Sequence, residues 1–198
     1  MTWGGVCLGM AGCAKHGEEL PLATLDQLKK EQDGLHIKST GELYTGYLIE
    51  HYPDSKTNQL QQLQAGQLKS RSVVRGGQLN GLSEGWYGGG QKQVQEMFVD
   101  GKSHGVRVKW HRNEKKSAEN SIDNGKLNGV CRKWHDNGQL AEEMTMVDGQ
   151  ADGLARSWHP DGSQKAEATL AMGEVLTQKF WKEGEKPVAG AVLAKQAE

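Results

Sequence analysis

The chain has 198 residues and carries 24 Lys and Arg against 25 Asp and Glu, so its formal net charge is −1 at pH 7. This balance gives no overall attraction to nucleic acid or to an anionic membrane surface, and it argues against a nucleic-acid partner. Glycine is abundant with 27 residues whereas proline occurs 4 times, a combination typical of a chain with many tight turns rather than of a disordered tract.

Residues 1–13 resemble a bacterial lipoprotein signal. A short apolar run leads to Met10-Ala11-Gly12-Cys13, in which Cys13 takes the place of the cysteine that receives the lipid. This interpretation predicts an exported chain, anchored through Cys13 at the periplasmic face of the cell envelope. The alternative is that Cys13 is an ordinary residue of a frayed terminus in a cytoplasmic protein, because no Lys or Arg precedes the apolar run.

Residues 14–40 predict a tether and one short N-terminal helix. Leu25 and Leu28 are spaced as on one helix face, and Asp33-Gly34 would end the helix. We expect this helix to act as a cap, since stacked repeats need a cover over the apolar surface of the terminal repeat.

A repeat occupies residues 41–184 and is clearest in its second half. Its copies begin 24 residues apart, at Gly77, Gly101, Gly125, Gly149 and Gly173. A second turn glycine follows in three of four copies, at Gly90, Gly138 and Gly162, with Glu114 as the exception. This leaves room for strands of about eight residues, so each copy is one hairpin. The sequence therefore predicts an all-β fold, an elongated single-layer antiparallel β-meander of ~24-residue hairpin repeats, with a C-terminal tail at residues 185–198.

Spacing that recurs from copy to copy predicts which side chains share a face of the sheet. A tryptophan stands nine residues after the leading glycine in four copies: Trp86, Trp110, Trp134 and Trp158. An apolar column four residues earlier falls on the same face: Leu82, Val106, Val130 and Leu154. If the hairpin loops have three residues, a second apolar column shares that face: Phe98, Ile122, Met146 and Leu170. Lys109 then faces Glu119, and Lys133 faces Glu143, on the polar side.

Two interpretations of the tryptophan row stay open. The indoles can pack against one another and against their neighbours, each removing roughly 150–250 Å² from water. Alternatively, part of the row stays exposed as a docking surface for a partner, because a single layer has no second sheet to cover it.

The histidines that follow three of the tryptophans do not predict a metal site. His111, His135 and His159 would recur about 9.6 Å apart, since each hairpin is two strands wide. That distance is too long for shared ligands of one zinc ion, so we expect these histidines on a solvated polar face. No serine or cysteine recurs in an activating setting, and Cys131 fits as an ordinary strand residue. We therefore expect no catalytic residue, cofactor, metal or small-molecule substrate.

The succession G-x-x-x-G, five residues to Trp, then x-x-(N/D)-G resembles the bacterial variant of the MORN repeat, a family often labelled YwqK-type antitoxins. The resemblance covers about residues 41–184. It implies an elongated single-layer sheet that acts by binding. We accordingly expect a non-catalytic module that binds an unknown protein partner, with a further contact to the membrane through the lipid on Cys13. The alternatives are an antitoxin or immunity protein of a toxin–antitoxin system and, third, an enzyme.

Overall fold

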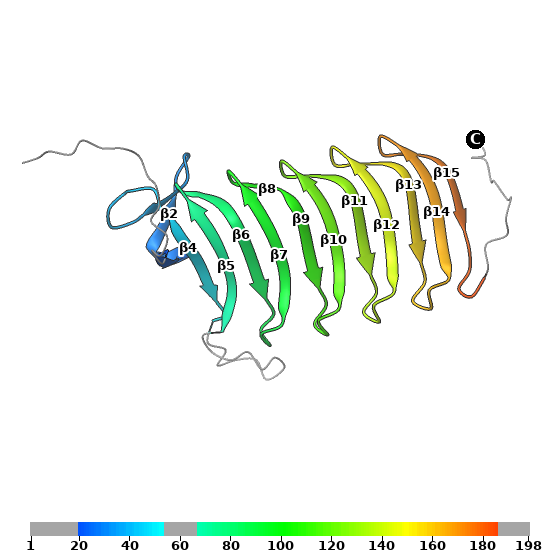
Figure 1. Ribbon diagram of the computed structural model, residues 1–198, viewed down its shortest axis with the longest axis horizontal. Coiled ribbons are helices and arrows are strands. Elements are labelled where there is room, and N and C mark those ends of the chain that lie inside the picture. Colours follow the sequence, from blue (N-terminus) through cyan, green and yellow to red (C-terminus); the bar gives the residue numbers. More distant parts are fainter. Residues whose placement is uncertain (1–19, 54–66, 186–198) are drawn as a thin grey trace, which may run out of the picture.

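The computed structural model describes residues 20–53 and 67–185, which form one elongated layer of β-structure (Figure 1). The expectations for the signal at residues 1–13, for lipidation of Cys13 and for the tail after Glu185 lie outside the described residues. Within the two described ranges, no helix combines the length and the apolar character that crossing a membrane requires.

One sheet of 13 strands runs through the whole described array. From β4 to β15 neighbouring strands are antiparallel and follow the order of the chain, with β8 as a short branch on β7, whereas β1 pairs parallel with β4. The strands of this sheet are β1 (Leu22–Thr24), β4 (Gly46–His51), β5 (Leu68–Arg75), β6 (Gln78–Trp86), β7 (Lys92–Val99), β8 (Lys102–Ser103), β9 (Gly105–Trp110), β10 (Lys116–Asp123), β11 (Lys126–Trp134), β12 (Leu140–Val147), β13 (Gln150–Trp158), β14 (Gln164–Ala171) and β15 (Glu174–Phe180). The predicted all-β fold with one long, mostly antiparallel sheet is confirmed.

The two ends of the hairpins use different turns. At the upper edge of the sheet in Figure 1, pairs such as Asn124-Gly125 and Asp148-Gly149 have both residues at positive φ, as a two-residue type I′ turn requires. At the lower edge a longer loop contains a single residue at positive φ, which is Gly138 in one repeat and Glu114 in the preceding one. The 24-residue spacing of the leading glycines therefore arises because these two turn types alternate along the chain.

Pairing within the hairpins differs by one residue from the prediction. In β11–β12, Trp134 pairs with Leu140 but Lys133 pairs with Glu142, so Ala141 is an extra residue that forms a bulge. Lys133 Nζ accordingly lies 2.7 Å from Glu142 Oε2. The predicted pairing of Lys133 with Glu143 is wrong, and so is that of Lys109 with Glu119, because Lys109 pairs with Ala118.

This one-residue difference places the two apolar columns on opposite faces of the sheet. Met146 pairs with Gly129, which has the opposite parity along β11 to Val130 and Trp134. The column of Phe98, Ile122, Met146 and Leu170 therefore does not share the face of the tryptophans, and that prediction is wrong. Ile122 and Met146 are buried on this second face.

The N-terminal cap contains no α-helix in its described part, residues 20–40. Leu25–Gln27 form a single 3-10 turn (η1) between β1 and β2 (Leu28–Lys30), and β2 pairs with β3 (Leu35–Ile37) in a separate two-stranded sheet. The predicted short helix is wrong because β1 instead pairs with β4, which leaves Leu25 half exposed and buries Leu28. A small core of Ala23, Leu28, Tyr44 and Val74 joins this cap to the first hairpin.

Candidate binding face

We call the side of the main sheet that carries the four tryptophans the tryptophan face. Trp86, Trp110, Trp134 and Trp158 are the last residues of β6, β9, β11 and β13, so they lie in one row along the lower edge of the sheet in Figure 1. Each is only partly exposed. The four indoles thus lie on one face of the sheet, and each is neither fully buried nor fully exposed.

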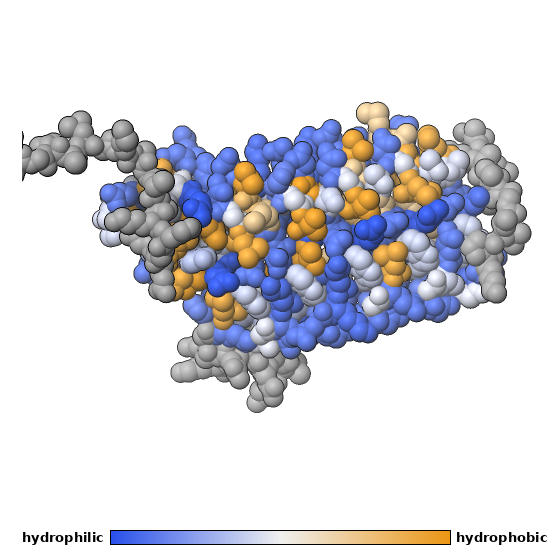
Figure 2. Space-filling model, viewed as in Figure 1, coloured by the Kyte–Doolittle hydropathy of each residue, from blue (hydrophilic) through white to orange (hydrophobic). Residues whose placement is uncertain are grey.

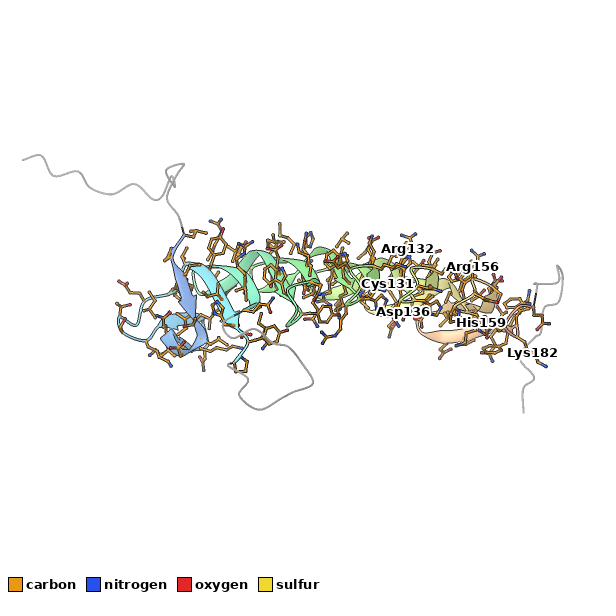
Figure 3. All side chains as sticks on the ribbon, turned by 90° about the horizontal axis from the view of Figure 1, so that it is seen from below. Cys131, Arg132, Asp136, Arg156, His159 and Lys182 are labelled. Carbon is orange, nitrogen blue, oxygen red and sulfur yellow. The ribbon has the colours of Figure 1, made fainter. Side chains whose placement is uncertain are left out.

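Ion pairs form a second row beside the tryptophans. Arg132 Nε donates to Glu143 Oε2 at 2.6 Å, and Arg156 Nε donates to Glu167 Oε2 at 3.0 Å. Arg132 and Arg156 extend from the same side of the sheet (Figure 3). The arginine side chains are about two-fifths exposed, at 39% and 43%, so each pair contributes no more than about 1 kcal/mol to stability. Their partly exposed charges remain accessible to a binding partner.

Exposed aliphatic side chains form a third row on this face. Val106, Val130 and Leu154 are 53%, 37% and 40% exposed, and Met97, which pairs with Leu82, is 46% exposed. Figure 2 shows the resulting apolar surface along the upper half of this face. Recurrent exposed apolar groups rimmed by polar ones mark interaction surfaces in many soluble proteins.

Lysines lie between successive indoles in the first half of the row. Lys92 Nζ lies 5.8 Å from the ring centroid of Trp110, and Lys116 Nζ lies 5.2 Å from that of Trp134. A cation over an aromatic face contributes about 0.5–1 kcal/mol at exposed sites. In the next two repeats Leu140 and Gln164 occupy the corresponding positions. The row therefore changes from cationic to uncharged toward the C-terminus.

The histidines join consecutive repeats rather than forming a solvated polar ladder, so that expectation is wrong. The Nε2 atoms of His111, His135 and His159 lie 2.8, 2.9 and 3.1 Å from the carbonyl oxygens of Trp134, Trp158 and Trp181. Since a carbonyl oxygen only accepts, Nε2 carries the proton in each case. The hydroxyl of Tyr87 donates to Trp110 O at 2.8 Å in the same way. The occurrence of Tyr and His in one column, both with a distal donor, is the sequence signal for this role.

Glu84 is a buried carboxylate that the sequence patterns did not single out. It is 7% exposed and accepts hydrogen bonds from Arg71 Nη2 at 2.7 Å and Lys92 Nζ at 2.8 Å. Burial acts to raise the pKa of the Glu84 carboxyl, but the hydrogen bonds from Lys92 and Arg71 outweigh it and hold the pKa below its ordinary value.

Burial raises the pKa of the Cys131 thiol, which lies on the opposite face. The structure therefore supports Cys131 as a buried strand residue of β11.

Residues 127–148, which contain most of β11 and all of β12, match the family model described as MORN repeat variant. No curated protein matches the chain. The narrower resemblance to YwqK-type antitoxins stays a prediction. The chain thus contains a MORN repeat variant, and MORN repeats are commonly protein or membrane interaction modules.

Proposed function

We propose that this chain is a non-catalytic binding module that holds a protein partner against the tryptophan face. The observation that carries the proposal is the row of exposed Val106, Val130 and Leu154 beside the half-exposed tryptophans, on a single layer that no second sheet covers within residues 20–53 and 67–185. Burying such a row against a partner removes apolar surface from water, which is the main driving force of association.

The mixed character of the face favours a protein over a lipid surface. The aliphatic row and the tryptophan row are separated by a row of arginine–glutamate pairs, including Arg132–Glu143 and Arg156–Glu167. Each pair is neutral overall, so this row provides no net attraction to anionic lipid headgroups. Alternating apolar and hydrogen-bonding rows instead resemble a protein interface, in which apolar and polar patches adjoin.

The test uses charge substitutions on the two faces. Val130→Asp lies on the tryptophan face at 37% exposure, and Val175→Asp is a matched control at 36% exposure on the opposite face, since Val175 pairs with Leu170. We expect proteins captured from cell-envelope extracts by the full chain to be retained by Val175→Asp and lost with Val130→Asp. Circular dichroism checks that both variants fold.

Two outcomes would contradict this proposal. One is a captured protein whose affinity is the same for the wild type and for Val130→Asp. The other is binding of the purified chain to phosphatidylglycerol vesicles, with loss of that binding in Val130→Asp. Substitution of a half-buried tryptophan such as Trp158 would lower both stability and binding, so the aliphatic row provides the cleaner test.

We also propose that a lipid on Cys13 anchors this module in the cell envelope. The support is the succession Met10-Ala11-Gly12-Cys13 after an apolar run. Cells that express the chain are grown with radioactive palmitate. The wild type and Cys7→Ser should incorporate label, whereas Cys13→Ser should not; an unlabelled wild type in the cytosolic fraction would contradict the anchor.

A further inference from the structure

Three potential metal ligands meet at the turn between β2 and β3, at the N-terminal end of the array. His36, in β3, is only 7% exposed. Its Nε2 atom lies 2.8 Å from Asp33 Oδ1 and 3.8 Å from Glu31 Oε2. One ligand atom from each of these side chains lies within 4.8 Å of the other two.

The other ring nitrogen of His36 fixes the direction of the imidazole. Nδ1 lies 2.8 Å from the carbonyl oxygen of Gly41, so Nδ1 carries a proton and donates it. This leaves Nε2 as the atom directed at the two carboxylates. A metal-binding histidine is commonly held in this way, with its second nitrogen donating to a backbone carbonyl.

We propose that Glu31, Asp33 and His36 bind one divalent transition-metal ion, with Zn²⁺ as the best match. Zinc accepts imidazole nitrogen together with carboxylate oxygen, whereas Ca²⁺ and Mg²⁺ favour sites made of oxygen ligands alone. Ligands about 2.0–2.2 Å from a tetrahedral zinc ion are separated by about 3.3 Å. The two distances from Nε2, 2.8 and 3.8 Å, lie on either side of that value.

The surroundings of the three side chains leave room for an ion to enter. The side chains of Glu31 and Asp33 are 45% and 64% exposed. Lys29 Nζ lies 2.6 Å from Glu31 Oε1, so the other oxygen of that carboxylate faces His36. On binding, the ion replaces the proton on Nε2, which passes to solvent. The bound ion would join the turn to β3 and stiffen the cap.

Isothermal titration calorimetry of the untagged full chain with ZnCl₂ tests this site. We expect one site whose Kd rises at least tenfold in Asp33→Asn and in Glu31→Gln. Both positions are exposed, so these variants should fold, as circular dichroism can verify. The matched control is Asp123→Asn. Asp123 Oδ1 lies 3.1 Å from His104 Nδ1, so this is also a carboxylate beside a histidine. It lies outside the cluster of Glu31, Asp33 and His36, the one such cluster among the described residues.

Nuclear magnetic resonance provides a second measurement on the same samples. Zn²⁺ should shift the imidazole signals of His36 and leave those of His104 unchanged, and millimolar Mg²⁺ should not reverse the shift. The proposal is overturned if the wild type binds no zinc, if Asp33→Asn and Glu31→Gln bind it as tightly as the wild type, or if Mg²⁺ displaces it.

Discussion

The hydrogen bond from His135 to Trp158 O allows one contact between repeats to be measured in isolation. The same column contains Tyr87, whose hydroxyl reaches Trp110 O at 2.8 Å, while His135 Nε2 lies 2.9 Å from its acceptor. A tyrosine at position 135 should therefore keep the bond, and a phenylalanine should lose it while filling nearly the same volume. The stability difference between His135→Tyr and His135→Phe then reports the hydrogen bond with little change in packing.

The expected difference is about 1 kcal/mol, because an intramolecular hydrogen bond contributes roughly 0.5–1.5 kcal/mol net. For a chain of this size, that corresponds to a lower Tm for His135→Phe by about 2–4 °C. Thermal and urea unfolding at one pH would measure it, and the exchange of Tyr87 for Phe or His is the matched experiment two repeats earlier in the same column. Equal stability of His135→Phe and His135→Tyr would refute the role of this bond.

Two further predictions concern the turns and the buried carboxylate. Glu114 has φ 64°, in the left-handed region that costs a side-chain-bearing residue about 1–2 kcal/mol, so Glu114→Gly should raise the free energy of unfolding by about 0.5–1 kcal/mol. Gly138, at φ 94° in the next repeat, is the control, and Gly138→Ala should lower stability in the same denaturation assay. Glu84→Gln should cost about 1 kcal/mol at neutral pH through weaker hydrogen bonds with Arg71 and Lys92. Because the folded-state pKa of Glu84 is lowered, its stabilisation is complete above the ordinary value of 4.5 and is lost as the pH falls through the folded-state pKa. Melting curves from pH 7 to pH 3 should therefore show the variant and the wild type converging, and a constant gap would contradict the assignment.

The repeat architecture could be predicted because it depends on local turn chemistry. Pairs such as Asn124-Gly125 favour type I′ turns whatever surrounds them, and their spacing gives the hairpins. The pairing across each hairpin could not be predicted in the same way. Alternation along β11 shows that Val130 and Trp134 share a face, but the bulge at Ala141 decides which residues of β12 join them.

The N-terminal helix was predicted from a single pair of leucines three residues apart, which is a weak signal. Leu25 and Leu28 fit one helix face. The strand structure forms instead because β1 pairs with the edge of β4, and no sequence pattern near Leu25 indicates that long-range pairing. A helix this short would be marginal without strong packing. The cap therefore follows tertiary pairing rather than local propensity.

The candidate site was predicted in part. The tryptophan row follows directly from the period, since each indole ends an equivalent strand. The roles of His135 and Glu84 were missed because they depend on neighbours from other strands, at Trp158 and at Arg71 and Lys92. A polar residue that recurs or stands alone in a column does not by itself reveal its hydrogen-bond partner on another strand.

A backbone hydrogen bond from a turn glycine to the preceding repeat recurs along the array. Gly125 N donates to Ser103 O, and Gly149 N donates to Leu127 O, each at 2.8 Å. Removal of residues 125–148 would join Asn124 to Gly149, restoring an Asn-Gly turn and the alternation of strands on either side. Whole units can thus be gained or lost without rebuilding the remainder. Such a scaffold can change the length of its surface in steps of one hairpin, so its reach can be adjusted to a longer or shorter target.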